Sequence, residues 1–159
     1  MVESQNSLKI PVSNKFIEFR NNKAMLYNKT KKPTSAALMR ADCELYEWHM
    51  AQINEWEPSS TWSWDGVSDK YGKVDVKVID KWWNIPISKG RNLFRQASII
   101  DHFYFIEKLT WPDRPLEEGD EVEVGFLGVM TWDEMAKVIQ VSRIPGYGYY
   151  VDVRKHANG

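Results

Sequence analysis

The chain has 159 residues, of which 21 are Lys or Arg and 22 are Asp or Glu, so its formal net charge is −1. This length suits one domain with its own core, and 43% hydrophobic residues, including 8 Trp, exclude a largely disordered chain. The sequence lacks a membrane-length apolar run, a signal-peptide pattern and a second cysteine, so it predicts a cytoplasmic protein with no membrane partner, disulfide or cysteine-based zinc site.

Two elements are predicted before the first helix. Residues 1–14, which contain one proline, are predicted to be a flexible arm, and residues 15–159 are predicted to form the single domain. Residues 15–29 are predicted to form a hairpin that turns at Asn21 and Asn22.

A long helix is predicted next. Thr34 or Ser35 suits its N-cap, and Pro58 ends it, so that it extends to about Trp56. The residues that fall at helical spacing are Leu38, Ala41, Leu45, Trp48 and Gln52.

Two extended segments, TWSWDGV and KVDVKVI, follow this helix and are joined by SDKYG. Gly72 supplies the backbone conformation that a tight turn requires, so these segments predict a hairpin. In the second segment, valines alternate with Asp75 and Lys77, which indicates a strand with one apolar and one polar side.

The remaining chain is predicted to alternate strands with short helices. A loop with two tryptophans leads into a short helix at 91–98, and apolar strands follow at 99–109 and 121–130. Thr131 is predicted to cap a further helix, and a last strand is predicted at 146–154. This order of elements predicts a mixed α/β sheet.

The small net charge conceals blocks of opposite sign. Residues 15–40 carry seven basic residues and one acidic residue, whereas residues 41–69 carry seven acidic residues and no Lys or Arg. Residues 70–108 are again mainly basic, and residues 109–137 are acidic. Such blocks are typical of solvated faces, and an acidic cluster between basic ones also suits a metal-dependent enzyme that acts on a polyanion.

Asp65, Asp75 and Lys77 form the sharpest pattern. Asp75 and Lys77 are two residues apart on a predicted strand, so they project to the same face, and Asp65 lies on the preceding strand within reach of it. Two carboxylates and a backbone carbonyl are oxygen ligands that suit Mg²⁺, and a lysine beside the ion can orient or deprotonate a water molecule. The pattern predicts metal-assisted phosphodiester hydrolysis, although D-x-K alone equally fits the solvent face of an edge hairpin.

This set of residues, in this order, resembles the PD-(D/E)XK nuclease superfamily over about residues 36–139. The resemblance implies a restriction-endonuclease-like mixed β-sheet flanked by helices, and a metal-dependent DNA endonuclease that leaves 5′-phosphate ends, of the kind that phages and bacteria carry. The segments that correspond to the family's helix, hairpin, connecting segment, apolar strand and closing strand with helix are ADCELYEWHM, WDGVSDKYGKVDVKVID, RNLFRQAS, IIDHFYFIEKL and VGFLGVMTWDEMAKV.

The resemblance implies specific roles for five residues. Asp65 and Asp75 would be the metal carboxylates, the Val76 carbonyl would be a further ligand, and Lys77 would be the catalytic lysine. Glu44 would be the helix glutamate that completes or water-bridges the site. The implied cofactor is Mg²⁺, for which Mn²⁺ can substitute.

Three positions leave alternatives open. Trp64 stands where the family has a proline. Asp69 is a rival to Asp65, but its place in the turn disfavours it. Glu47 is a rival to Glu44, which is preferred because it flanks the helical stripe expected to face the sheet.

DNA is the expected partner, and a homodimer is expected if both strands are cut. Basic residues on either side of the acidic centre would contact phosphates, and one tryptophan would stack on bases or wedge a duplex. The residues predicted to bind DNA are Lys29, Lys31, Lys32, Lys81, Trp82, Lys89, Arg91 and Arg95. One alternative is an inactive, nuclease-like nucleic-acid-binding or assembly protein, and another is a structural protein with no nucleic-acid role.

Other polar residues are predicted to be structural. Asp101 begins an apolar strand, where a hydrogen-bonding role is expected rather than metal binding. His102 is expected to pack within that strand, because the three histidines have no spacing suited to zinc. Gln96 is expected to be a solvated helix residue. The sequence contains no phosphate-binding glycine loop and no serine-nucleophile motif.

Overall fold

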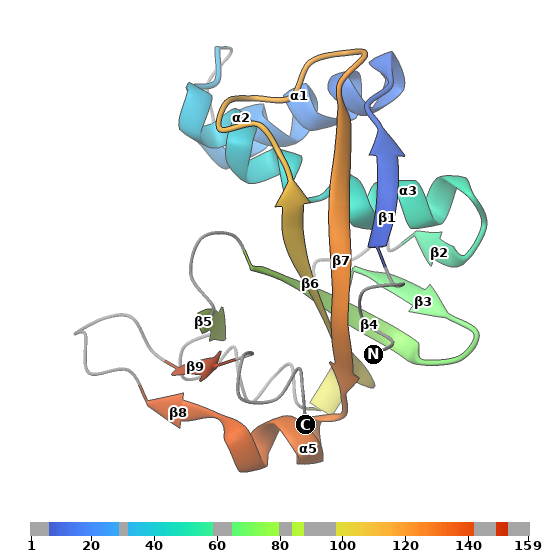
Figure 1. Ribbon diagram of the computed structural model, residues 1–159, viewed down its shortest axis with the longest axis vertical. Coiled ribbons are helices and arrows are strands. Elements are labelled where there is room, and N and C mark those ends of the chain that lie inside the picture. Colours follow the sequence, from blue (N-terminus) through green and yellow to red (C-terminus); the bar gives the residue numbers. More distant parts are fainter. Residues whose placement is uncertain are drawn as a thin grey trace.

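A six-stranded mixed β-sheet with helices packed against it organises the protein (Figure 1). The computed structural model describes residues 7–28, 32–58, 65–79, 84–87, 98–141 and 149–152. Within this part of the chain the fold is mixed α/β, as the order of the predicted elements indicates.

The strand order of the main sheet is β1-β7-β6-β4-β3-β2. Its strands pair antiparallel, except that β4 and β6 are parallel. The strands are β1 (Ser7–Pro11), β2 (Trp56–Pro58), β3 (Gly66–Ser68), β4 (Gly72–Ile79), β6 (His102–Thr110) and β7 (Glu121–Met130). A second, antiparallel sheet has the order β5-β9-β8 and consists of β5 (Asn84–Ile87), β8 (Gln140–Val141) and β9 (Tyr149–Asp152).

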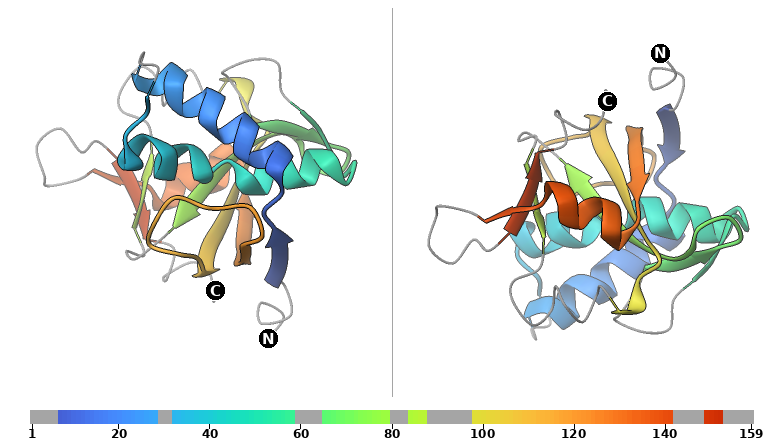
Figure 2. Two further views of the ribbon diagram at one scale, coloured as in Figure 1. Left: turned by 90° about the horizontal axis from the view of Figure 1, so that it is seen from above. Right: turned by 90° about the horizontal axis from the view of Figure 1, so that it is seen from below.

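Four helices have defined bounds in the described part of the chain: α1 (Asn14–Asn28), α2 (Ser35–Asp42), α3 (Leu45–Gln52) and α5 (Trp132–Val138). The first three lie together along one side of the main sheet, whereas α5 lies at the opposite end of the molecule near the three-stranded sheet (Figure 2). Among the described residues, none of these helices is long and apolar enough to cross a membrane.

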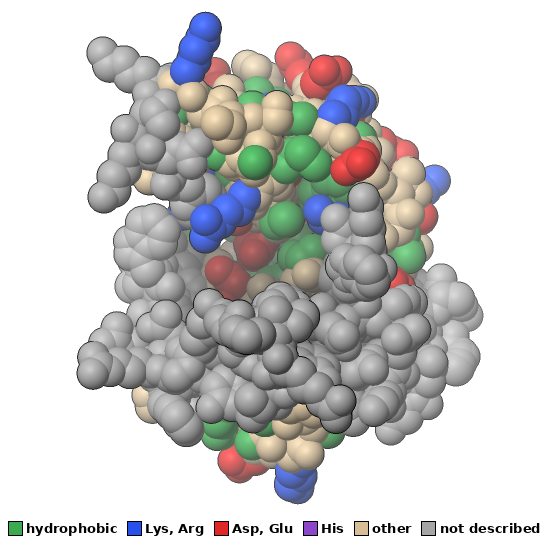
Figure 3. Space-filling model, turned by 90° about the vertical axis from the view of Figure 1, so that its left-hand side faces the viewer, with side chains coloured by type: hydrophobic (Ala, Val, Ile, Leu, Met, Phe, Trp, Pro, Cys, Tyr) green, Lys and Arg blue, Asp and Glu red, His purple; other side chains and the backbone are tan. Residues whose placement is uncertain are grey.

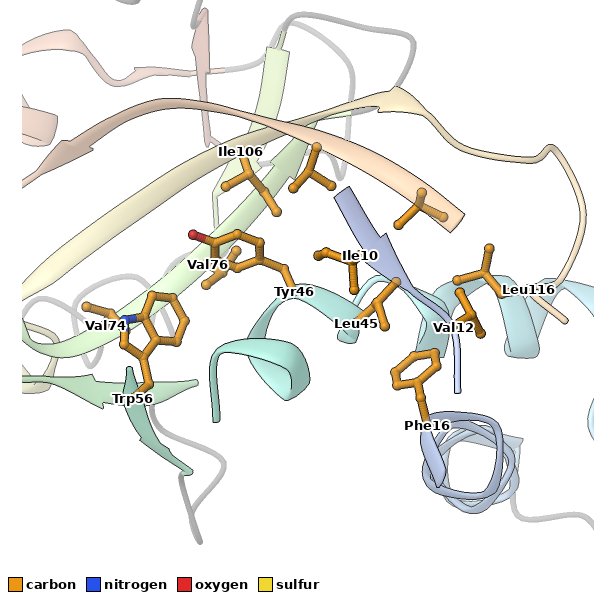
Figure 4. Close-up of a cluster of buried hydrophobic side chains, with 12 residues drawn as sticks. Ile10, Val12, Phe16, Leu45, Tyr46, Trp56, Val74, Val76, Ile106 and Leu116 are labelled. Atoms are coloured by element: carbon orange, nitrogen blue, oxygen red, sulfur yellow. The ribbon is translucent and has the colours of Figure 1, made fainter. Parts of the chain in front are cut away.

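The larger core lies between the main sheet and helices α1 and α3 (Figure 4). Tyr46 and Trp56 pack edge to face, with ring centroids 5.6 Å apart, against the buried valines of β4. The core residues are Ile10, Val12, Phe16, Leu45, Tyr46, Trp56, Val74, Val76, Ile106, Leu116, Val122 and Val124. A smaller core of Ile100, Phe103, Phe105 and Met135 lies between β6 and α5.

Several local predictions are confirmed because they depend on short-range chemistry. Thr34 caps α2 by accepting a hydrogen bond from the Ala37 N–H, and Thr131 forms a capping box with Glu134 at the start of α5. The β3–β4 hairpin turns where predicted, with Gly72 at a φ of 69°. Strands β6, β7 and β9 also lie within the segments predicted to be strands.

The structure corrects the predictions for the N-terminal region. Ser7–Pro11, placed in the predicted flexible arm, instead forms strand β1, which pairs with β7. Residues 15–29, predicted to be a hairpin, fall instead almost wholly within α1, so Asn21 and Asn22 lie in a helix rather than a turn. The sheet edge and the helix contacts in this region come from distant segments, which local patterns do not reveal.

The predicted long helix is two helices and a strand. Cys43 and Glu44 break it, because their N–H groups donate to Arg40 and Ala41, three residues back, in a tight turn between α2 and α3. The second helix ends at Gln52 rather than near Pro58, which lies in β2. A strand, β5, also occupies part of the predicted tryptophan loop, and the predicted helix at 91–98 lies almost entirely outside the described residues.

A buried ion pair joins α1 to α2. Arg20 Nη1 donates to Asp42 Oδ1 at 2.7 Å, and both side chains are almost completely inaccessible to solvent. The other carboxylate oxygen of Asp42 accepts a hydrogen bond from the Leu116 N–H, 2.9 Å away in the β6–β7 connection. Asp42 therefore fixes the position of α1 and of a distant loop relative to the end of α2.

Candidate active site

Among the described residues, β3 pairs with only the first part of β4, and the remaining part of this edge is named the open edge of β4. The two strands pair only from Gly66–Ser68 to Gly72–Val74, and the Asp65 N–H extends the pairing by donating to the Val74 carbonyl at 2.8 Å. The next N–H group on this edge of β4 is that of Val76, and it donates a hydrogen bond to the Asp65 side chain, whose Oδ2 is 2.6 Å away. The Asp65 carboxylate therefore lies against the β4 backbone where β3 leaves it.

Asp75 and Lys77 lie on this part of β4, on the same face, as predicted. The parallel register places them beside Phe103 and Phe105 of β6. Lys77 Nζ lies 2.7 Å from Asp75 Oδ2, with the two side chains 13% and 12% exposed. The two charges form an ion pair without the alignment of a hydrogen bond, so Asp75 Oδ2 is buried with no hydrogen-bond partner in the described part of the chain.

The carboxyl group of Asp75 is close enough to affect the ionisation of Asp65. Burial raises the pKa of Asp65, and the charge of Asp75 and a hydrogen bond with it raise it further, to about 7. The Val76 N–H and the Lys77 ammonium oppose this rise in pKa. Asp65 consequently keeps a proton close to neutral pH unless another positive charge enters the site.

Glu47 of α3 is a third carboxylate at this site. Its oxygen Oε2 is buried and has no hydrogen-bond partner among the described residues. Burial raises the pKa of Glu47 well above its usual range, and the charges of Asp65, Glu44 and Asp75 raise it further. The Glu47 carboxyl therefore belongs to the same electrostatic cluster as the two aspartates.

The structure places the two candidate helix glutamates differently. Glu44, the preferred residue, lies at the break between α2 and α3, and its Oε1 is 3.5 Å from Lys23 Nζ of α1. Glu47, the alternative, is the one with a buried oxygen that lacks a hydrogen-bond partner among the described residues and with a pKa that burial and the charges of Asp65 and Asp75 raise. The sequence offered one signal for Glu47, since it stands between two aromatic residues, Tyr46 and Trp48, in a segment that packs against the core.

One face of the molecule is hollowed. Figure 3 shows acidic side chains at the bottom of a hollow on one face of the molecule, with Lys or Arg side chains close to them. The arrangement agrees with an acidic centre bordered by positive charge, which the charge blocks of the sequence predicted.

The carboxyl groups of this site are candidate ligands for a divalent cation. No three His, Cys, Asp or Glu side chains within the described ranges form a ready-made metal cage. The carboxyls of Asp65, Asp75 and Glu47 nevertheless offer hard oxygen ligands, and both Asp75 Oδ2 and Glu47 Oε2 are buried without a hydrogen-bond partner in those ranges. Like-charged buried carboxylates without enough counter-charge fit a cation that retains water ligands, as Mg²⁺ does.

Three other residues considered in the sequence have defined locations in the structure. Asp69 is exposed in the β3–β4 turn, away from the position of a ligand. Asp101 pairs with the Lys73 backbone through its side chain and its N–H, and His102 packs against Tyr71, so both have structural contacts as predicted. The Val76 carbonyl remains a prediction as a ligand.

Most of the predicted DNA-binding residues cannot be placed. Lys32 is described and exposed. The residues that lie outside the described part of the chain are Lys29, Lys31, Lys81, Trp82, Lys89, Arg91 and Arg95, together with Gln96. Their roles stay predictions from the sequence.

Comparisons with known proteins identify no relative of this chain. No family model, curated protein or solved structure matches the chain. The interpretation of the site therefore depends on the residues themselves.

Proposed function

We propose that this protein is a Mg²⁺-dependent DNA endonuclease with a restriction-endonuclease-like sheet, which hydrolyses phosphodiester bonds to leave 5′-phosphate ends. The observation that supports this function is the convergence of Asp65 and Asp75 beside Lys77 at the open edge of β4. A cluster of buried carboxylates with a single close lysine is unfavourable for stability, and such clusters are typical of functional sites.

Each residue of the cluster has a distinct role in this proposal. Asp65, Asp75 and Glu47 would hold the divalent cation, with the Val76 carbonyl as a further ligand and Mn²⁺ as a substitute for Mg²⁺. The cation supplies Lewis-acid polarisation of the phosphodiester when it is bound. Glu47 takes the place that the resemblance assigned to Glu44, because its carboxyl lies in the cluster.

Lys77 acts on the attacking water. Its Nζ is held 2.7 Å from Asp75, so the ammonium group is fixed beside the carboxylates rather than free to rotate in solvent. From this position it can orient the water and donate a hydrogen bond to the charge that develops on the phosphate. The water oxygen forms the new bond to phosphorus and loses one proton to solvent, the bond from phosphorus to O3′ breaks, and O3′ takes up one proton from solvent, which leaves a 3′-hydroxyl and a 5′-phosphate.

Plasmid cleavage tests this function. The wild-type chain is incubated with supercoiled DNA and Mg²⁺, and the product ends are checked for 5′-phosphate. Asp75→Asn and Lys77→Met are expected to lower the cleavage rate by about 100-fold or more, because they remove a ligand and the residue that orients the water. Asp69→Asn, in the exposed turn, is the matched control and should cut like wild type. Equal cutting by all four proteins would contradict the assignment.

A second function, an inactive nucleic-acid-binding or assembly protein, has two observations in its favour. Asp75 is already paired with Lys77, and the described residues contain no ready-made cage of three ligands. This alternative predicts DNA binding that weakens with salt but is unchanged by chelator or by Asp75→Asn. The nuclease predicts that Mg²⁺ changes both cleavage and the thermal stability of the chain.

One chain provides one such site, so we propose a homodimer in the cytoplasm as the form that cuts both strands. A monomer is expected to nick supercoiled plasmid to the open circular form, whereas a dimer is expected to produce linear DNA as an early product. Sedimentation of the chain with and without duplex DNA measures the assembly directly.

A further inference from the structure

Lys23 lies on the face of α1 that packs against the rest of the protein. Arg20, Lys23 and Ala24 are three and four residues apart, which places them on one face of the helix. Arg20 and Ala24 on this face are buried, and the Lys23 side chain is only 23% exposed. Lys23 is thus held against the protein, unlike a typical solvated helix lysine.

The Lys23–Glu44 contact differs from the ion pair one helical turn away. Arg20 and Asp42 are 2.7 Å apart and almost fully buried, so neither charge is accessible to a ligand. Lys23 Nζ and Glu44 Oε1 are 3.5 Å apart, and their side chains are 23% and 25% exposed. A charged group in a long, water-accessible ion pair can exchange its partner at a small cost in free energy.

The position of Lys23 follows from the buried pair. Arg20–Asp42 sets the register of α1 against the end of α2. Lys23 is one turn further along α1, and Glu44 is two residues after Asp42, so fixing the first pair brings the second together. The charge of Glu44 also acts on the Glu47 carboxyl, which places Lys23 at the margin of the carboxylate cluster.

We propose that Lys23 binds a phosphate of the DNA backbone next to the reacting phosphodiester, and that Glu44 is a positioning residue for Lys23 rather than a metal ligand. This inference depends on the proposed nuclease function. Without DNA, the contact with Glu44 restrains the Lys23 side chain, so less side-chain freedom is lost when a phosphate takes the place of Glu44. Basic side chains border the acidic ones in the hollow of Figure 3, as such a phosphate path requires.

The first experiment compares Lys23→Met with Lys23→Arg. Steady-state cleavage of a fluorescein-labelled duplex oligonucleotide is measured with Mg²⁺, and its binding is measured by anisotropy with Ca²⁺ at several salt concentrations. Lys23→Met is expected to raise KM and Kd about 3- to 10-fold with kcat nearly unchanged, and to reduce the salt slope of binding by about 1. Lys23→Arg should retain most of the affinity, because the positive charge stays in place.

Lys15→Met is the matched control, since Lys15 lies on the same helix but is exposed. It should leave KM and the salt slope unchanged. Thermal melts of each variant establish that the variants are folded. A Lys23→Met protein that is folded and matches wild type in both KM and salt slope overturns the inference.

The second experiment tests Glu44. Glu44→Gln is expected to raise KM and Kd about 2-fold while it keeps kcat and the Mg²⁺-induced rise in melting temperature, and the double variant with Lys23→Met should bind DNA like Lys23→Met alone. Loss of the Mg²⁺-induced rise in Glu44→Gln would make Glu44 a metal ligand and overturn the positioning role. If wild type cuts DNA but the Lys23 variants behave like wild type, only this inference fails. If wild type neither binds nor cuts DNA, the proposed function fails with it.

Discussion

Asp42 and the carboxylates beside β4 are buried in the same domain but differ in their hydrogen-bond partners. Both oxygens of Asp42 have close partners, Arg20 Nη1 at 2.7 Å and the Leu116 N–H at 2.9 Å. Asp75 Oδ2 and Glu47 Oε2 are also buried, and although Lys77 forms an ion pair with Asp75 at 2.7 Å, neither oxygen has a hydrogen-bond partner in the described ranges. The first group is complete without a ligand, whereas the second is not.

The electrostatics follow the same division. Burial raises the pKa of Asp42 above its usual range, and the Leu116 N–H and the Arg20 charge oppose this rise. At Asp65, burial and the neighbouring Asp75 charge act together, and the pKa rises to about 7. A satisfied buried charge stabilises one structure, whereas an unsatisfied group of like charges retains free energy that a cation can recover on binding.

Removal of Asp42 is expected to have the largest effect on stability. Asp42→Ala leaves Arg20 buried without its partner and the Leu116 N–H without an acceptor, so the free energy of unfolding should fall by about 3–5 kcal/mol. Urea unfolding measures this change. Asp69→Ala in the exposed turn is the control and should have little effect. A loss of less than about 1 kcal/mol in Asp42→Ala would show that the pair is not needed to hold α1 and α2 together.

Addition of Mg²⁺ should stabilise the chain by the next largest amount. At a free Mg²⁺ concentration about 100 times the Kd, the free energy of unfolding should rise by about 2.7 kcal/mol. Because Asp65 releases its proton only near pH 7, protons compete with the cation below that pH, and the rise in melting temperature should be larger at pH 8 than at pH 6. Differential scanning fluorimetry at the two pH values measures it, with Asp75→Asn as the control that should not respond. An equal rise at both pH values would exclude Asp65 as a ligand.

Replacement of Asp65 should raise stability in the absence of metal. The unfolded chain releases the Asp65 proton near pH 4 and the folded chain only near pH 7, so the unfolded state binds fewer protons in this window and the free energy of unfolding falls as the pH rises. Asp65→Asn avoids this loss and keeps an acceptor for the Val76 N–H. Its advantage over wild type should grow from about pH 4 to about pH 7 and reach about 1–2 kcal/mol.

Urea unfolding of both proteins between pH 4 and pH 8 gives this difference directly. Asp69→Asn, which changes an exposed carboxylate of the same turn, provides the baseline. A constant difference across the pH range would mean that the Asp65 pKa is not raised.

Glu47 should give the smallest change in stability and a clear change in metal response. Glu47→Gln replaces a carboxyl whose ionised form is disfavoured by burial and by the neighbouring carboxylates, so the metal-free chain should gain about 0.5–1 kcal/mol. The Mg²⁺-induced rise in melting temperature should be smaller than in wild type, because one oxygen ligand is lost. Glu44→Gln is the matched control on the neighbouring turn. If Glu44→Gln lowers the Mg²⁺-induced rise in melting temperature and Glu47→Gln does not, the metal-binding role belongs to Glu44.

The part of the site that was predictable from the sequence lies within one hairpin. Asp65, Asp75 and Lys77 are brought together by strand alternation and a turn at Gly72, both of which depend on a few adjacent residues. The caps at Thr34 and Thr131 were predictable for the same reason. The mixed α/β character followed from the order of these local elements.

The rest depended on contacts that a sequence pattern does not contain. The tight turn at Cys43 and Glu44 interrupts the helix, although the predicted stripe still meets the core at Ala41, Leu45 and Trp48. The stripe alone does not separate Glu44 from Glu47, because their surroundings depend on contacts with α1 and with the β3–β4 hairpin. Strand β1 and helix α1 were missed because pairing with β7 and docking on α2 determine them, and both partners are distant in the sequence or across a turn.

The short length of β3 also has a consequence for the order of folding. The Asp65–Val76 hydrogen bond joins residues 11 apart, whereas the Asp42–Leu116 bond joins residues 74 apart. Closing the short loop costs less chain entropy, so we expect the hairpin that carries both aspartates to form before α1 and α2 are locked to the β6–β7 connection. The repulsion between these carboxylates would then be present from the earliest stages, and divalent cations should speed folding as well as stabilise the folded chain.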